Sequence, residues 1–294
     1  MGVTGLARWA NAPTTGLDLI GQNIIRNHQG VARGKWYLSV KSYRSQLQSI
    51  PGIQVHAERT MTALTMNEHV FVQLDDPVSH SRADLLQPLP EGQVPIPLTG
   101  PGSPAHFRTT FLTLSPPGAL EQLLAQCRAR WVSVRQSGTS GLSQGSGQQL
   151  SVDGVVYSVG TDFIVRAGNV ILAGGAVKGM LLEAEYLPLS AMPPGSNGTM
   201  ELLNNLLVSI LPNVTDDGMN AITINDLLWE EVLWDREQEE ESLDKEPEKE
   251  KEPSTFVTGD EELVSHRTGD WTGVDRDRRS AYLIIGALRG EGLL

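Results

Sequence analysis

Residues 155–187 contain three runs rich in Val, Ile, Leu, Phe and Tyr, separated by short glycine-containing segments. β-Branched and aromatic residues favour strands, and glycine favours the turns between them. We place the turns at Ala167-Gly168-Asn169 and at Gly174-Gly175. Because short turns join strands antiparallel, this block predicts three strands of an antiparallel sheet.

Further strands are predicted in the N-terminal half of the chain. From Lys35 to Tyr43, apolar and polar side chains alternate, which is the pattern of a half-buried strand. Thr60–Thr65 and His69–Leu74 are shorter strand candidates, joined by a turn at Met66-Asn67-Glu68. Together these segments predict an antiparallel meander.

Apolar residues recur at helical spacing in four other segments. Helices are predicted over Thr15–His28, over Leu120–Trp131 after a start at Ser115-Pro116-Pro117, from Thr199 to Leu211, and near Arg278–Arg289. Thr199 is the expected cap of the third helix, and Pro212 ends it. Cys127 lies on the apolar stripe of the second helix, so we interpret it as a small core residue. Helices beside an antiparallel sheet define an α+β fold.

The negative charge of the chain is confined to its C-terminal part. The whole chain has 23 basic and 35 acidic residues, and residues 1–225 have 14 and 15 of them. Subtraction leaves 9 basic and 20 acidic residues in 226–294, a net charge of -11. Residues 235–252 alone hold 10 acids and 4 bases around a single aliphatic residue, Leu243. Such a segment cannot bury enough apolar surface to fold by itself, so a disordered linker is predicted.

These features predict a body, a linker and a returning helix. We expect a body at residues 1–225, an acidic linker at 226–276 and a C-terminal helix at 277–294 that packs back on the body. The proline-rich stretch 77–104 and the Gly/Ser/Gln-rich stretch 136–149 are expected to be loop insertions in the body.

Composition excludes several classes of protein. A single cysteine, Cys127, cannot form an intramolecular disulfide or a cysteine-based zinc site. The absence of a clustered set of Lys and Arg argues against binding of nucleic acid through phosphates. There is no signal-peptide pattern and no apolar run of about 18 residues, so we expect a soluble, unsecreted protein without a membrane span.

Most catalytic motifs are missing from the sequence. There is no phosphate-binding G-x-x-x-x-G-K-[ST] and no H-E-x-x-H. The match to G-x-S-x-G at Gly141–Gly145 lies in the Gly/Ser/Gln-rich stretch that is expected to be a loop, whereas a catalytic serine of this motif needs a strand-to-helix turn. We therefore expect no catalytic residues, no metal and no cofactor.

One pair of acids remains as an alternative. Glu183 and Glu185 project from the same face of a predicted strand, because side chains alternate along strands. On the inside of a closed barrel they could bind a divalent ion and serve a triphosphate tunnel-type phosphohydrolase. Such a tunnel also needs several inward-facing bases, and residues 150–190 contain only Arg166 and Lys178. We therefore interpret the glutamate face as solvent-exposed.

A possible docking segment precedes the acidic linker. Residues 222–234 combine aliphatic side chains and two tryptophans with acids. Packing on the chain's own core is one interpretation. The other is a partner-binding site formed by Trp229, Leu233 and Trp234, because tryptophan is enriched at binding hot spots.

The order of these elements resembles the family of Mediator complex subunit 20, in a fungal version. The resemblance covers the start Met1-Gly2-Val3-Thr4, the strand Gly34–Tyr43, the helix Leu120–Trp131, the block Tyr157–Leu187 and the end Ser280–Arg289. The central block is the most specific part. The matching residues there are Tyr157, Asp162-Phe163, Arg166, Gly168, Gly179, Glu183, Glu185 and Tyr186.

The resemblance implies a fold and a set of partners. It implies an antiparallel β-barrel with a few packed helices that forms a heterodimer with Mediator subunit 18. It also implies that the C-terminal helix of subunit 8 ties this pair into the head module of Mediator. The implied role is nuclear and noncatalytic: coactivation of RNA polymerase II transcription, with contact to the TATA-binding protein and no cofactor.

Overall fold

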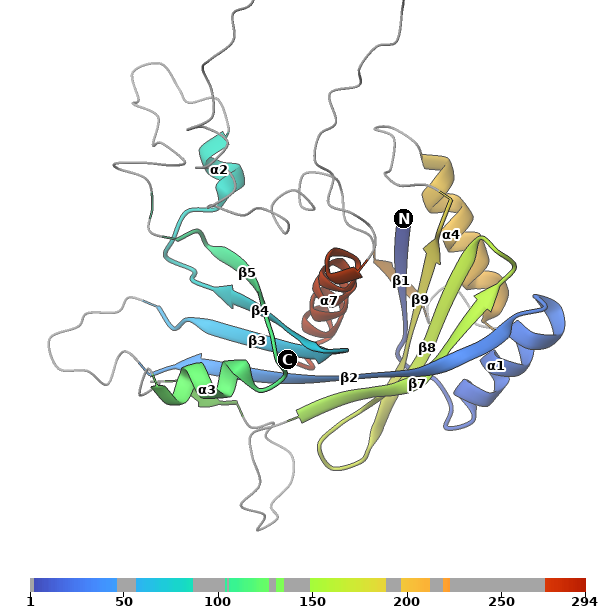
Figure 1. Ribbon diagram of the computed structural model, residues 1–294, viewed down its shortest axis with the longest axis horizontal. Coiled ribbons are helices and arrows are strands. Elements are labelled where there is room, and N and C mark those ends of the chain that lie inside the picture. The colour runs from blue at the N-terminus through green and yellow to red at the C-terminus, as the bar shows by residue number, and fades with distance from the viewer. Residues whose placement is uncertain are drawn as a thin grey trace, which may run out of the picture.

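A single antiparallel sheet forms the framework of the molecule (Figure 1). The computed structural model describes residues 3–46, 57–86, 104, 106–126, 131–134, 149–188, 197–211, 219–222 and 273–294. The strands are β1 (Val3–Trp9), β2 (Val31–Ser45), β3 (Thr60–Met66), β4 (His69–Asp75), β5 (Thr109–Leu114), β6 (Trp131–Ser133), β7 (Gln149–Val159), β8 (Phe163–Ile171), β9 (Val177–Tyr186) and β10 (Met219–Ile222).

Nine of the strands follow the order β10-β1-β9-β8-β7-β2-β3-β4-β5, and β6 pairs with the end of β2. All pairings are antiparallel. The 15-residue β2 joins the two halves, because it pairs with β7 along Val31–Lys41 and with β3 along Leu38–Arg44. The sheet is strongly curved, and the two halves face each other across its concave side (Figure 1).

The helices cover both faces of this sheet. They are α1 (Gly16–Asn27), the short α2 (Arg82–Leu86), α3 (Ala119–Gln126), α4 (Asn197–Ile210) and α7 (Gly273–Gly290). Helix α7 lies inside the curve of the sheet, whereas α1 and α4 cover the outer face of the half that contains β1, β9 and β8 (Figure 1). No helix in the described part of the chain has the length and apolarity needed to cross a bilayer.

Each face of the sheet has its own apolar core. The concave core joins α7 to residues from strands in both halves of the sheet, including Leu6, Leu38 and Phe71. A second core, around Ala167 and Leu182, lies between the outer face and the helices α1 and α4. A small third core packs Leu120 of α3 on the outer face of β3 and β4. Because both faces of β9 are covered, its residues from Gly179 to Glu185 are all buried.

Most of the predicted elements are present. The helix predicted at Thr15–His28 is α1, the strands predicted in the N-terminal half are β2, β3 and β4, and the C-terminal helix is α7, which begins at Gly273. The prediction of an α+β fold is confirmed. Among the described residues, the end strands β5 and β10 do not pair with each other. The structure therefore shows a curved antiparallel sheet and does not show the closed barrel implied by the resemblance.

The first predicted turn of the central block is wrong. The three strands are present, and the second turn at Gly174-Gly175 is correct, but the first turn lies at Gly160–Asp162 and Gly168 lies in the middle of β8. Gly168 pairs with Gly154. A Cβ atom on Gly168 would lie 2.7 Å from Cγ1 of Val152 and 3.1 Å from Cε3 of Trp36. The glycine therefore permits close packing inside the sheet and does not mark a turn.

Two helix boundaries also differ from the prediction. Trp131 begins strand β6 and does not extend α3, whose described residues end at Gln126. Helix α4 begins at Asn197, so Thr199 lies inside its first turn and is not its cap. Strands β1, β5, β6 and β10 and the helix α2 were not predicted.

Candidate functional site

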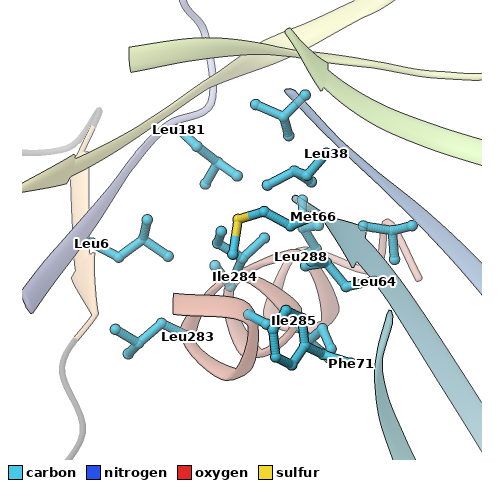
Figure 2. Close-up of a cluster of buried hydrophobic side chains, with 14 of the residues drawn as sticks. Leu6, Leu38, Leu64, Met66, Phe71, Leu181, Leu283, Ile284, Ile285 and Leu288 are labelled. Carbon is cyan, nitrogen blue, oxygen red and sulfur yellow. The ribbon is translucent and has the colours of Figure 1, made fainter. Parts of the chain in front are cut away.

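The concave face of the sheet is filled by α7. Leu283, Ile284, Ile285 and Leu288 project from this helix toward apolar side chains of both halves of the sheet, and each is at most 1% exposed (Figure 2). Met66 lies at the centre of this cluster (Figure 2). The concave interior of the sheet is thus occupied by the protein's own helix.

Glu183 and Glu185 point into this concave interior. They lie on the same face of β9 as Leu181, and they are 0% and 1% exposed. Register places Arg166 of β8 directly opposite Glu183 and diagonal to Glu185. The Arg166 Nη1 bonds to Glu183 Oε1, and its Nη2 lies 3.1 Å from Glu185 Oε2. The Ser280 hydroxyl of α7 donates to the second oxygen of Glu183.

The two glutamates stabilise the charged form of Arg166. Burial by itself disfavours the charged guanidinium, but the carboxylates of Glu183 and Glu185 outweigh it and raise the pKa of Arg166 above its ordinary value. An arginine side chain stays protonated at neutral pH, so it cannot bind a metal ion or act as a general acid. The arrangement is therefore a buried ion network that ties two strands to α7.

The prediction that the glutamate face is solvent-exposed is wrong. The alternation of side chains correctly placed Glu183 and Glu185 on one face of the strand. That face is not exposed, because α7 covers it and α1 and α4 cover the opposite face of β9. The hydrolase alternative is not supported by this geometry. In the described residues, no group of three or more His, Cys, Asp or Glu side chains could hold a metal ion, and Arg166 occupies the space between the two carboxylates.

Other polar contacts fix the position of α7 along the sheet. Asp277 near its start accepts a hydrogen bond of 2.6 Å from Asn67 in the turn between β3 and β4. Arg289 near its end lies 2.6 Å from Asp75, and Glu291 beyond it lies 2.9 Å from Nε of Arg8. Arg8 is 2% exposed. Its burial lowers the pKa of the guanidinium, and the Glu291 carboxylate partly offsets this effect.

A second polar cluster lies at the base of the 77–104 stretch. The buried Asp76 accepts from Arg59 Nε at 2.7 Å, from His106 Nε2 at 2.8 Å and from the backbone N–H of Val78 at 3.1 Å. Ser79 lies 2.9 Å from the same His106 nitrogen. Because Ser79 and Asp76 share Nε2, the imidazole cannot relay a proton between them, so these residues form a structural clamp and not a catalytic triad.

The predicted partner-binding residues Trp229, Leu233 and Trp234 lie outside the described residues, as does Cys127. Of the segment 222–234, Ile222 is described, at the end of β10. Sequence reasoning missed the roles of Ser280, Arg8 and Asp76. A signal for Arg166 was present, since it is one of two bases between residues 150 and 190, but its pairing with both glutamates depends on register.

Comparison with known proteins gives a family and a set of distant folds. No curated protein sequence matches this chain closely enough to count as a relative. Among solved structures, similar chains include a protein from Pyrococcus horikoshii OT3, with 12% identity, a TM-score of 0.37, and coverage of 77% of this chain and 96% of that one. A Vibrio parahaemolyticus protein described provisionally as an adenylate cyclase gives 8% identity, a TM-score of 0.36, and coverage of 77% and 97%. A Hippeastrum protein described provisionally as an adenylyl cyclase, with a dominant triphosphatase activity, gives 12% identity, a TM-score of 0.33, and coverage of 74% and 93%.

The family comparison covers most of the sequence. The model of the TATA-binding related factor of subunit 20 of the Mediator complex matches residues 1–221 of the 294. This range contains β1 to β9 and the helices α1 to α4, that is, nearly all of the sheet. The chain therefore belongs to the Mediator subunit 20 family, and it is a noncatalytic, nuclear subunit of Mediator that acts in RNA polymerase II transcription.

Proposed function

We propose that this chain is the partner of Mediator subunit 18 in the head module, where the C-terminal helix of subunit 8 holds the pair. The observation that supports this role is the filling of the concave face by α7. A body whose interior is occupied by its own helix offers its outer surface to other proteins. This role as a coactivator subunit includes contact with the TATA-binding protein and RNA polymerase II, and no direct contact with nucleic acid or membrane.

We further propose that the sheet is a β-barrel closed around α7. Helix α7 contacts β1, next to the end strand β10, and also β3 and β4, close to the end strand β5. The two ends of the sheet therefore lie on either side of one helix of about 10 Å diameter. In this arrangement residues 1–225 are the body, an acidic linker extends from residue 226 to the start of α7 at Gly273, and this helix completes the interior.

The partner-binding segment is proposed to be Trp229, Leu233 and Trp234. Strand β10 is the last strand at its end of the sheet, and its final residue is Ile222. Trp229 follows Ile222 by only seven residues in the sequence. The segment thus follows the last described strand of the body closely in the sequence, and two of its three residues are tryptophans, which are enriched at binding hot spots.

Co-expression with subunit 18 tests the heterodimer. We expect the two chains to elute together on size exclusion as one 1:1 species at micromolar concentration. Two separate monomer peaks at that concentration would contradict the proposal.

The double variant Trp229→Ala with Trp234→Ala tests the docking segment. If these side chains contact the partner, their loss should weaken the complex by roughly tenfold or more, since hot-spot residues contribute about 2 kcal/mol or more each. The melting temperature of the isolated chain should not change. Ile25→Ala is the control, because Ile25 is a large apolar residue that is 52% exposed on α1. A large fall in melting temperature would instead assign the tryptophans to the core.

A further inference from the structure

A small pocket opens beside the first turns of α7, on the side of the sheet where β2, β7 and β8 meet. Its volume is about 250 Å³. We call it the mouth pocket, and the residues with polar groups that line it are Lys35, Trp36, Tyr37, Asn67, Arg166, Arg276, Asp277 and Ser280. It lies next to the buried ion network but has polar groups of its own.

Trp36 supplies a buried donor without an acceptor. Its side chain is 4% exposed, and its Nε1 has no hydrogen-bond partner. Cε3 of the indole faces Gly168 of β8, because a Cβ atom there would lie 3.1 Å away. Nε1 is on the opposite edge of the ring system and therefore faces away from β8. Indole N–H can only donate, so this atom requires an acceptor.

The acceptors of the mouth pocket are largely engaged already. Asp277 Oδ2 accepts from Asn67 at 2.6 Å, and Asp277 Oδ1 accepts from Arg276 at 3.3 Å. A second buried donor, Nε of Arg276, has no partner. Among the described residues that line the pocket, Trp36 and Arg276 are thus the two that carry a buried side-chain atom without a partner, and both atoms, Trp36 Nε1 and Arg276 Nε, are donors.

The charges around the pocket limit what it can accept. Each cation already has a carboxylate neighbour: Lys35 lies 3.3 Å from Asp153, Arg276 lies beside Asp277, and Arg166 is bound to the two buried glutamates. A ligand with several negative charges would be repelled by these carboxylates. A group with one negative charge and two acceptor oxygens matches the two free donors.

The size of the pocket selects the kind of molecule that presents this group. Sites for small molecules and cofactors usually have volumes of about 300–1,000 Å³, above that of the mouth pocket. The volume here suits a single side chain or a chain end. A subunit that works by assembly with other subunits would meet such a group on a polypeptide.

We propose that the mouth pocket binds one carboxylate of a partner polypeptide, which accepts from Trp36 Nε1 and Arg276 Nε. This inference rests on membership of the Mediator subunit 20 family and does not depend on subunit 18 being the partner. Its failure would leave the heterodimer proposed above untouched, because the test uses peptides and not subunit 18.

Two-dimensional NMR of the full chain with ¹⁵N-labelled tryptophan tests the proposal. The indole resonance of Trp36 is identified by its loss in Trp36→Phe. We expect this resonance to shift saturably on titration with the peptide acetyl-Leu-Glu-Leu-amide or with acetyl-Leu-Leu-Leu carrying a free C-terminal carboxylate. The peptide that binds more tightly shows whether the pocket prefers a glutamate side chain or the carboxylate of a chain end. Acetyl-Leu-Gln-Leu-amide should give no saturable shift.

Arg276→Met is the diagnostic variant, and Arg26→Met is its control. Arg276→Met should weaken peptide binding by about tenfold, as expected for a lost hydrogen bond to a charged group. Arg26 is exposed on α1, on the opposite face of the sheet, so its replacement should leave the titration unchanged. Equal shifts with the glutamine peptide, no shift with either carboxylate, or equal affinity in Arg276→Met would overturn the proposal.

Discussion

The buried network of Arg166, Glu183 and Glu185 contains one cation and two carboxylates. Its members are nearly inaccessible to water, and one oxygen of Glu185 has no hydrogen-bond partner. Taking charges out of water costs free energy, and the mutual attraction of the three groups offsets that cost only while all of them are present. The network therefore specifies how α7 sits on the sheet, and it does so with little tolerance for the loss of one partner.

Arg166→Met should lower the free energy of unfolding by about 3–5 kcal/mol, because it leaves two buried carboxylates without a cation. Chemical denaturation measures the change. Lys35→Met is the matched control and should cost about 0–1 kcal/mol, since the Lys35–Asp153 pair is largely exposed. Adding Glu183→Gln to Arg166→Met should recover part of the loss. Equal effects of Arg166→Met and Lys35→Met would show that the network does not contribute as described.

The clamp at Asp76 should make stability depend on acid pH. Burial raises the pKa of this carboxyl, but hydrogen bonds from His106 and Val78 and the charge of Arg59 outweigh it, so the net effect lowers the pKa below its ordinary value of 3.8. A carboxyl with a lowered pKa stabilises the fold above its ordinary pKa, and this stabilisation is lost as the pH falls through the lowered value.

Asp76→Asn should therefore destabilise the protein at pH 6 and have a shrinking effect as the pH falls from about 5 to 2. Urea denaturation of both proteins across this range measures the difference. His106→Ala removes one of the hydrogen bonds to Asp76 and should reduce the same pH dependence. A difference between wild type and Asp76→Asn that stays constant with pH would contradict this account.

At the scale of residues, the sequence predicted that Glu183 and Glu185 share one face of a strand, but it did not predict what covers that face. Alternation places both on one face of β9, whichever side that face meets. Whether it meets water depends on α7, which lies about ninety residues further along the chain. We expected the pair to be exposed to water because only two bases, Arg166 and Lys178, lie near it in the sequence. That expectation was wrong because a helix covers this face of β9.

Helix α7 has two chemically different halves. Its first turns carry Asp277, Arg279 and Ser280, which contact polar groups of the sheet. Its later turns carry Ile284 and Leu288, which are 0% exposed in the concave core. The polar contacts of the first turns, together with those of Arg289 and Glu291 at the other end, set the position of the helix along the sheet, and the apolar residues between them pack in the concave core.

Ile284→Ala should lower the free energy of unfolding by about 2–5 kcal/mol, because it leaves a cavity where both halves of the sheet meet α7. Val274→Ala is the control on the same helix. Val274 is 38% exposed, so its truncation should cost far less, within about 0.5 kcal/mol. A cost for Ile284→Ala no larger than the control would mean that α7 is not part of the core. Thermal or urea denaturation distinguishes these outcomes.

The elements that sequence reasoning found were those with clear periodicity, such as α1, β3 and β4. Strand β1 was missed because Gly5 and Arg8 interrupt its apolar pattern, and the buried position of Arg8 depends on Glu291 at the far end of the chain. Gly168 was assigned to a turn because glycine favours turns, whereas here it allows two strands and Trp36 to approach. Trp131 fitted the helical stripe of α3 by spacing, but it pairs with Ser45 of β2 as part of β6.

At the scale of the whole molecule, the filled interior distinguishes a scaffold from an enzyme. The purified chain should release no phosphate from tripolyphosphate or nucleoside triphosphates with Mg²⁺ or Mn²⁺, because α7 covers Glu183 and Glu185, and Arg166 binds both. A colorimetric phosphate assay measures this, with Glu183→Ala as the background. Activity in the wild type that disappears in Glu183→Ala would contradict a noncatalytic role.

The position of α7 in the chain has a consequence for synthesis. Every strand of the sheet is translated before this helix, and the concave face needs it to cover residues such as Leu6, Leu38 and Phe71. While the ribosome is still adding residues 223–272, the completed strands expose an apolar surface that their own neighbours cannot bury. The nascent subunit therefore exposes a surface that chaperones bind until α7 emerges from the ribosome. A polypeptide truncated before Gly273 would keep this surface exposed and would be directed toward degradation.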